Sequence, residues 1–529
     1  MWNSSKRQAC FASLLALSMG VAGCHHPQSL SVARTEVSGS AQAVAGQGAL
    51  TLTIRWPQRP ERSVQVVPVA AEEAVLVVKD SADKELLTRS LSRELDGEIA
   101  QLQINLPVGH DYRLSAVMRG ADGEPLAKGT SAPFSIAANQ VTTVKIRLDS
   151  IIVSFAGTGV SSFEGEGVLA TEATIQNPAT VATDAAGNVY VPVRKSALDG
   201  NVIRKISPDG IISTVVGLPP GSSDPHLSGN GIPARNTLMS SPLGLSVSPD
   251  GDMLVGHEVY NADAKAPAVY RLLFIPARSG VRFGMDMQAG CSYELYSSSA
   301  KYESVLLGPD DTVYASQRNW VLRVNPDRSV DTVAGKPADT TGGAGLDGPA
   351  TASALKTTDG LALDSHGNLF ISDRNNHRVR MVCRKPGTYF GIPMQEGWIY
   401  TIAGLYAEGA WQRTAAKFPY EDGKPGLQSS LGFPRGLVFD DRGNLYISDS
   451  INALVRKLTP EGTLITVAGK GKATEWRDTT TNTWFSEPLG DGGSSLEASF
   501  YNPGGLAFGP RGELYIADTT NHRIRRIYL

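Results

Sequence analysis

Six equivalent positions lie near the ends of repeated apolar strands, and they are occupied by Val193, His257, Gln317, Asp373, Asp449 and Asp518. The His and Asp side chains among them could carry chemistry. One imidazole and three carboxylates on one rim would offer donors for a metal ion. In three copies, however, the Asp precedes a short Asn-containing turn, where Asp accepts backbone N–H bonds. Equivalent atoms on adjacent repeats also lie too far apart for metal–ligand distances of about 2–2.6 Å. We therefore expect no metal site and structural roles for the three carboxylates.

The pair His257-Glu258 departs from the repeated pattern and is the candidate for general acid–base catalysis. A catalytic base needs a partner within hydrogen-bond reach. Outside the repeat, His226 is the only other histidine expected on that rim. The sequence has no phosphate-binding Gly-rich loop that opens a helix, and no Gly-x-Ser-x-Gly nucleophile elbow. We therefore expect no catalytic constellation and no cofactor, with His257 and Glu258 as the remaining catalytic candidates.

These positions belong to an internal repeat that runs from Ile151 to the end of the sequence. The clearest copies are 360–373, 436–449 and 505–518, and weaker copies begin near 179, 244 and 305. Each copy reads as a strand, a tight Asp/Gly/Asn turn and a second strand. A third strand follows with a basic residue at its centre, namely Arg204, Arg271, Arg323, Arg380, Arg456 or Arg525. With a fourth strand, each copy predicts one blade of a β-propeller.

Two copies carry a motif that resembles a known repeat family. The segments 375–379 and 521–524 contain Asn-His-Arg, which is similar to the Asn-His-Leu/Arg core of NHL repeats. The resemblance implies a six-bladed NHL-type β-propeller over 151–529, with His377 and His522 as structural residues of the repeat. The last copy ends after its third strand, whereas 151–157 reads as a fourth strand without a blade before it. We expect 151–157 to close the ring, because closure removes an exposed edge.

The first residues have the pattern of an export signal. Lys6 and Arg7 precede an apolar stretch that is too short to span a bilayer core of about 30 Å. The following 21–24, Val-Ala-Gly-Cys, resembles the lipobox of bacterial lipoproteins, which implies a signal peptide over 1–23 and lipidation of Cys24. The alternative is an ordinary secretory signal with a chance Cys. We expect a flexible tether over 24–46 and membrane attachment through lipid only, at the outer membrane or the extracytoplasmic face of the cell envelope.

Residues 47–150 predict a small antiparallel β-sandwich that acts as a spacer. Apolar and polar residues alternate along Leu50–Trp56, and similar strands are expected at 74–78, 100–106, 112–118 and 141–148. The segment resembles the Ig-like modules of envelope lipoproteins. The predicted fold class is therefore all-β, a sandwich followed by a propeller.

Long loops are expected on the face where the second and fourth strands of each blade end. Two of them are rich in aromatic residues, which are Tyr406, Trp411, Phe418, Tyr420, Trp476, Trp484 and Phe485. Exposed aromatics on a rigid scaffold are typical of a binding surface. The alternative is that these rings only fix their own loops to the propeller.

The segments 280–293 and 387–400 align without gaps, and both join third to fourth strands. This alignment puts Cys291 in blade 2 and Cys383 in blade 4. A disulfide needs Cα atoms within about 7 Å, so we expect two free thiols.

The expected function is binding or scaffolding of a protein or glycan ligand. The balance of 49 basic and 52 acidic side chains argues against a nucleic-acid partner. The alternative is a propeller lyase, similar to streptogramin lyase or the peptide-amidating lyase, with His257 near the channel.

Overall fold

The computed structural model describes residues 47–55, 71–92, 99–138, 140–144, 146, 148–196, 200–218, 229–239, 241–259, 268–337, 345–405, 421–471 and 489–529. The expected signal peptide, Cys24 and the tether lie outside these ranges. In the described ranges, no helix is long and apolar enough to cross a bilayer.

The described residues between 47 and 150 form β1 (Gln47–Arg55), β2 (Glu73–Lys79), β3 (Glu85–Ser92), β4 (Ile99–Pro107), β5 (Gly109–Arg119), β6 (Pro125–Thr130), β7 (Phe134–Ile136), β8 (Val141–Thr143) and β9 (Asp149–Ser150). These strands make two packed sheets, with strand order β4-β1-β8 in one and β3-β2-β5-β6-β9 in the other. In β2, Ala74, Leu76 and Val78 are buried while the residues between them are more exposed, as alternation predicts. The pair β1–β8 is parallel, and within the strand expected at 141–148 the structure describes a strand over the first three residues.

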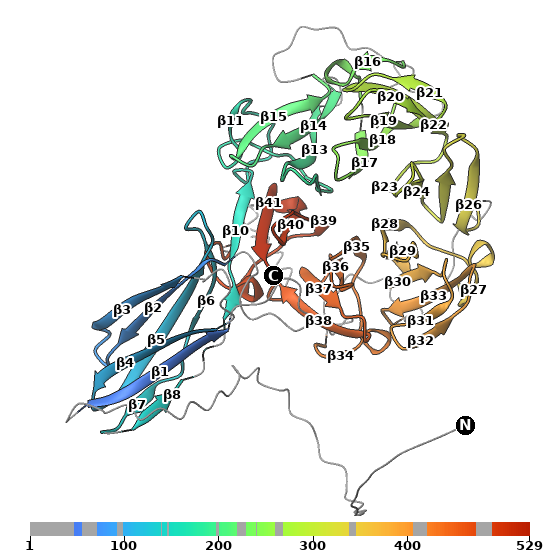
Figure 1. The fold of residues 1–529 in the computed structure, drawn as a ribbon. Helices are drawn as coiled ribbons and strands as arrows, with labels where there is room; N and C mark the ends of the chain where they lie inside the picture. Colours follow the sequence, from blue (N-terminus) through green and yellow to red (C-terminus); the bar gives the residue numbers. More distant parts are fainter. Residues whose placement is uncertain are drawn as a thin grey trace, which may run out of the picture. The chain divides into compact units, whose positions relative to one another are not determined.

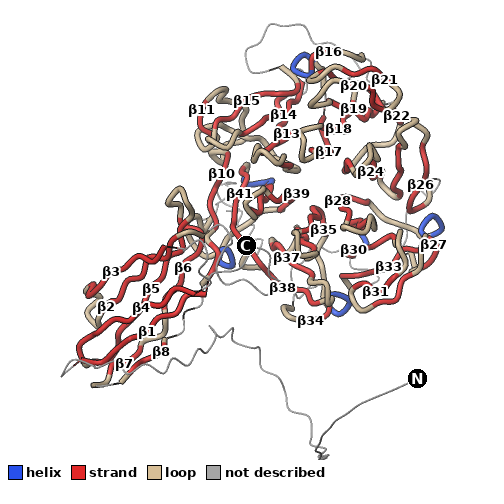
Figure 2. Tube along the Cα trace, viewed as in Figure 1, coloured by secondary structure: helices blue, strands red, loops and turns tan. Residues whose placement is uncertain are grey.

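The rest of the chain is a six-bladed β-propeller whose sheets surround a central axis (Figures 1 and 2). Blade 1 contains β12 (Ala182–Thr183), β13 (Val189–Ser196), β14 (Gly200–Ile206) and β15 (Ile211–Val216). Blade 2 contains β17 (Ser241–Val247), β18 (Met253–Glu258), β19 (Tyr270–Ile275) and β22 (Cys291–Ser298). Blade 3 contains β23 (Ser304–Leu307), β24 (Val313–Gln317), β25 (Trp320–Val324) and β26 (Val330–Gly335).

Blades 4 to 6 complete the ring. Blade 4 contains β28 (Thr358–Leu363), β29 (Leu369–Asp373), β30 (Arg378–Val382) and β33 (Trp398–Ala403). Blade 5 contains β35 (Pro434–Phe439), β36 (Leu445–Asp449), β37 (Leu454–Leu458) and β38 (Thr463–Ala468). Blade 6 contains β39 (Pro503–Phe508), β40 (Glu513–Asp518), β41 (Arg523–Tyr528) and β10 (Ile152–Ala156). The strand β10 pairs antiparallel with β41, which is the pairing that ring closure requires.

A connector leads from the fourth strand of one blade to the first strand of the next. In four blades it adds a short outer strand to the fourth strand of the blade that it enters, and these are β11 (Val168–Leu169), β16 (Ile232–Pro233), β27 (Gly348–Pro349) and β34 (Lys424–Pro425). In blade 6 a single bridge joins Ser494 to Ile151. Four connectors also contain a 3₁₀ turn, which is η1 (Ala234–Asn236), η2 (Ala350–Ala352), η5 (Gly426–Gln428) or η6 (Ser495–Glu497).

Neighbouring blades are held together by apolar packing and by side-chain hydrogen bonds. Phe370 and Met381 of blade 4 pack with Leu437 and Ile447 of blade 5 in one buried cluster. A Ser on the second strand donates a hydrogen bond to a carbonyl oxygen on the first strand of the next blade. These bonds join Ser316 to Asp359 at 3.1 Å, Ser372 to Arg435 at 2.7 Å, and Ser448 to Gly504 at 2.6 Å.

The duplicated segments form two hairpins on the face where third strands end. One is β20 (Gly280–Arg282) with β21 (Met285–Met287), and the other is β31 (Gly387–Tyr389) with β32 (Ile392–Met394). The guanidinium of Arg282 in the first hairpin binds Asp311 of blade 3 and lies 3.0 Å from Asp252. Cys291 and Cys383 are free, as expected.

Candidate functional site

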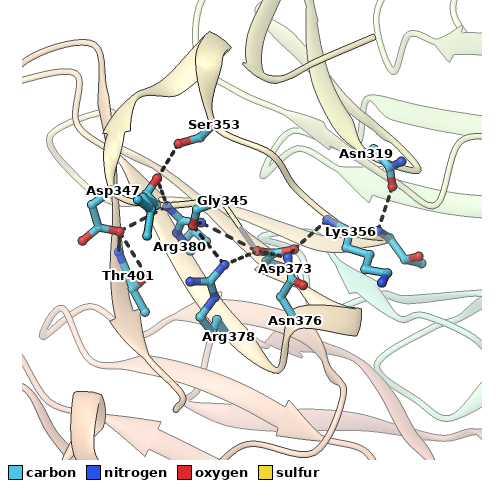
Figure 3. Close-up of polar contacts among 12 residues, drawn as sticks. Asn319, Gly345, Asp347, Ser353, Lys356, Asp373, Asn376, Arg378, Arg380 and Thr401 are labelled. Atoms are coloured by element: carbon cyan, nitrogen blue, oxygen red, sulfur yellow. Dashed lines mark hydrogen bonds and ion pairs between the residues drawn. The ribbon is translucent and has the colours of Figure 1, made fainter. Parts of the chain in front are cut away.

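The face where second and fourth strands end carries Asp373, Asp449 and Asp518, and we call it the Asp face. In blade 4, Asp373 and Arg380 are both fully buried, and 3.7 Å separates the carboxylate from the guanidinium. Arg380 donates to the carbonyl oxygens of Gly345 and Leu346 and lies 3.2 Å from Asp347 (Figure 3). Arg378, which is also buried, lies 3.2 Å from Asp373 and donates to the carbonyl oxygen of Gly345, so two buried cations join the second strand to the connector outside the blade.

The same buried arginine recurs in blades 1, 5 and 6. Arg204, Arg456 and Arg525 have no exposed surface. They bind the connector through Glu166, Asp422 and Asp491, with nitrogen–oxygen distances of 3.4, 3.1 and 2.7 Å. In blades 4, 5 and 6 these arginines therefore bind an Asp-Gly pair of the connector, which is Asp347-Gly348, Asp422-Gly423 or Asp491-Gly492.

Blades 2 and 3 depart from this pattern, which corrects the expectation of an equivalent basic residue in every third strand. Arg380 pairs with Ile371, two residues before the end of the second strand, and the same register places Leu273 in blade 2 and Leu322 in blade 3. Arg271 and Arg323 occupy other positions of the strand. They remain partly exposed and pair with Glu294 and Asp331.

Each Asp of the repeat binds groups on both sides of its strand end. Asp373 accepts the N–H of Lys356, seventeen residues earlier, and both of its oxygens accept the side-chain amide of Asn376 (Figure 3). Gly432 and Tyr501 donate their N–H groups to Asp449 and Asp518 in the same way. The expected backbone bond within the following turn is thus replaced by an Asn side chain. Burial raises the pKa of Asp449 to about 6 and also raises the pKa of Asp373 and Asp518.

His377 and His522 of the Asn-His-Arg motif join neighbouring blades. Both have a left-handed backbone, with φ of 56° and 53°. The Nδ1 atom of His377 accepts the N–H of Phe433, which leads into blade 5, and the two rings stack at 4.7 Å. The Nδ1 atom of His522 accepts the N–H of Asn177, which leads into blade 1. The second contact crosses the closure of the ring.

The bond to Phe433 predicts a pH dependence. Burial lowers the pKa of His377 to about 4, against an ordinary value of 6.5. The unfolded chain therefore binds more protons between these values, and the stability from neutral His377 is lost as the pH falls from 6.5 through 4. In His377→Asn, which keeps a residue tolerant of this backbone, that contribution is absent. In urea unfolding measurements from pH 4 to 8, the free energy of unfolding of the wild type should rise relative to that of the variant up to pH 6.5. Parallel pH profiles of the two proteins would contradict the assignment.

His257, the catalytic candidate, is 2% exposed on β18. Its Nδ1 lies 2.8 Å from the carbonyl oxygen of Glu258, and its Nε2 has no hydrogen-bond partner among the residues that the structure describes. Burial lowers the pKa of His257 to about 4, which makes it a weak base at neutral pH. Across the described residues, no group of three or more His, Cys, Asp or Glu side chains is arranged to hold a metal.

The central channel has a volume of about 340 Å³ and is lined by the first strands of all six blades. His257 and Glu258, on a second strand, are not among its lining residues. Its lining includes Glu303, Asp359 and Arg435, and the last two form an ion pair at 3.0 Å. These three residues were not among the candidates predicted from the sequence. Asp359 and Arg435 directly precede the repeated glycines Gly360 and Gly436, which is a signal that could have identified them.

The aromatic candidates of the long loops lie outside the described residues. The described ends of these segments are anchored on the Asp face. The N–H groups of Gly217, Gly404 and Gly469 donate to carbonyls of the next connector, at 3.0, 3.0 and 2.8 Å. In the two segments that follow Gly404 and Gly469, a buried arginine binds the other end, at the carbonyl oxygens of Glu421 and Leu489. The scaffold therefore fixes both ends of these two segments, which are the ones that carry the aromatic residues.

The repeats are similar to those of known NHL proteins. The model of the teneurin NHL domain matches residues 159–255 and 414–528. NHL repeat-containing protein 2 of Bos taurus is 31% identical over 172 residues, which cover 31% of this chain and 20% of the relative. Teneurin-m of Drosophila melanogaster is 24% identical over 301 residues, covering 56% of this chain and 10% of the relative. The chain thus spans a fifth or less of the length of these relatives.

Two solved structures match the chain at low identity and low TM-score. An auxiliary nutrient binding protein from Bacteroides ovatus is 15% identical, with a TM-score of 0.48, and the match covers 85% of this chain and 90% of that chain. A streptogramin B lyase is 11% identical, with a TM-score of 0.36, and the match covers 69% of this chain and 96% of that chain.

Proposed function

We propose that this protein is a non-catalytic binding module of the cell envelope, attached by lipid on Cys24 and displayed on the sandwich domain. Its NHL-type propeller binds a protein or glycan through the long loops of the Asp face. The observation that carries this proposal is the anchoring of both ends of the two aromatic-rich loops, by a glycine N–H on one side and a buried arginine on the other. Such anchoring lets loop sequence and length vary for recognition while the scaffold stays constant.

The repeat supports this proposal because it commits its own polar groups to structure. The carboxylates of Asp373, Asp449 and Asp518 are fully buried and bound by neighbouring N–H groups. The ligand contacts would then come from the loops, where Trp411 and Trp484 offer large amphipathic surfaces of the kind that dominates binding energy.

Binding of the purified full chain to isolated envelope fractions, with and without a Trp411→Ala, Trp484→Ala pair, tests the proposal. We expect the pair to weaken binding by about tenfold or more, since central aromatic residues often contribute 2 kcal/mol or more each. Trp398→Ala is the matched control, because Trp398 begins a fourth strand on the opposite face. Equal binding by all three proteins, or equal loss in the control, would refute the proposal.

His257→Ala separates this function from the lyase alternative. The variant should leave ligand binding unchanged, because His257 is buried and absent from the channel lining. A turnover of the bound ligand that His257→Ala abolishes would instead support a lyase.

A further inference from the structure

Among the described residues, blade 3 lacks both the outer strand that four other blades receive from their connectors and the single bridge that blade 6 receives. Its sheet has the order β23-β24-β25-β26, so β26 is a free edge among the described residues. The cause is visible in the sequence, because only 299–303 separate β22 from β23, and this link is too short to run out along the edge and return. An uncovered edge strand is a template for pairing with another chain.

In the other five blades the edge is filled by a pair of residues with a constant pattern, which we call the connector pair. An acidic or amide residue precedes a glycine: Glu166-Gly167, Asn230-Gly231, Asp347-Gly348, Asp422-Gly423 and Asp491-Gly492.

The side chain of the first residue accepts hydrogen bonds from the fourth strand. Thr401 donates its N–H and hydroxyl to Asp347 at 2.9 and 3.1 Å, and Thr466 donates the same groups to Asp422 at 2.8 Å each.

The glycine of the connector pair completes the contact with the strand. Gly167, Gly423 and Gly492 donate their N–H groups to the carbonyl oxygens of Ile212, Leu464 and Ile152 at 2.8–3.0 Å. The strand register makes Thr332 the equivalent of Thr401, and Val330 the equivalent of Ile212. Blade 3 therefore presents the same two donors and the same acceptor, and none of them has a partner in the described part of the chain.

A hollow of about 650 Å³ lies between the outer edge of blade 2 and the turn that leads into β26. Blade 2 lines it with Arg271, with Glu294 to Ser297 of β22 and with Asn230 of its connector, and blade 3 lines it with Arg328. At four other junctions a 3₁₀ turn of the connector packs on the fourth strand of the preceding blade.

We propose that the free edge of β26 binds a partner protein through an extended segment of the pattern Asn-Gly-apolar-Pro. The first residue of the pattern is expected to be Asn by analogy with blade 2. This blade has Leu273 where four blades have the buried arginine, and its connector carries Asn230 where theirs carry an acidic residue. The Asn230 oxygen accepts the N–H of Glu294 at 2.8 Å. Blade 3 has Leu322 at that position, so a carboxylate there would be desolvated without a cation.

The probe is a fluorescent peptide with the sequence of residues 229–236, added to the purified full chain. We expect saturable binding, measured by anisotropy. Methylation of the peptide nitrogen at Gly231 should weaken it by about tenfold, the effect of one lost hydrogen bond. Replacing Asn230 by Asp in the peptide should also weaken binding. No saturable binding, or equal binding of the methylated peptide, would overturn the proposal.

Protein variants locate the site. Thr332→Pro removes the donor N–H and should abolish binding, and Thr332→Val, which keeps that N–H, guards against misfolding and should weaken binding only partly. Thr401→Val is the control, because its edge is already filled. The Trp411→Ala, Trp484→Ala pair should leave peptide binding intact. The proposed peptide site and the proposed binding function of the loops are therefore tested by different variants. Sedimentation would expose the rival occupant: a dimer that Thr332→Pro dissociates would assign the edge to a second copy and overturn the proposal.

Discussion

Replacing Arg456 with leucine should lower the free energy of unfolding by about 3–5 kcal/mol, because it leaves the buried carboxylate of Asp449 without its cation. Arg456 also donates to the carbonyl oxygen of Glu421 in the connector, so the variant loses this anchor as well. Urea unfolding at pH 7 measures the loss, and hydrogen exchange should report faster opening of the connector that contains Glu421.

Blade 3 supplies the compensating change for this experiment. It has Leu322 and Gln317 where blade 5 has Arg456 and Asp449. The double variant Arg456→Leu, Asp449→Gln removes the unpaired charge together with the cation, and it should recover part of the lost stability. Arg323→Leu is the control, since its ion pair with Asp331 is partly exposed and should contribute little. A control variant as unstable as Arg456→Leu would contradict this account.

Gly436→Ala is expected to destabilise the propeller by about 1–3 kcal/mol, the usual cost of overpacking. A Cβ atom at Gly436 would lie against the carbonyl oxygen of Gly504 and 2.9 Å from both the Gly505 Cα and the Leu506 nitrogen. These are backbone atoms of blade 6, so blades 5 and 6 would have to separate around the channel.

A matched glycine makes this test specific. Gly348 is also buried, but a Cβ atom there meets nothing within 4 Å and its backbone is not left-handed. Gly348→Ala should therefore leave the thermal midpoint nearly unchanged, whereas Gly436→Ala lowers it. A shared loss would show that the general cost of replacing glycine, and not the close approach of two blades, explains the result.

Most of the fold follows from local sequence features. The Asp/Gly/Asn turns and apolar alternation predict strands and hairpins, because turn geometry and strand period depend on residues that are near neighbours. Their repetition, with Asn-His-Arg at His377 and His522, gives the propeller and the blade count. The pairing of β10 with β41 could also be predicted, since one copy lacks a fourth strand and one fourth strand lacks a copy.

The candidate site was less predictable because its contacts join distant residues. A basic residue in each third strand looked equivalent, yet register depends on the length of the preceding turn, and a shift of one residue exchanges the two faces of a strand. Arg323 is shifted by one position and Arg271 by two, so Leu322 and Leu273 take the buried place.

The repeat, the closure of the ring and the two unpaired cysteines could be predicted because each depends on the order and spacing of residues along the chain. The buried positions of the arginines, the contacts of the connector pairs and the open edge of blade 3 depend on tertiary contacts. Those properties arise where a connector folds back on the strand of a blade that it enters, as Asp347 does on Thr401. Such contacts span about fifty residues, and no local propensity encodes them.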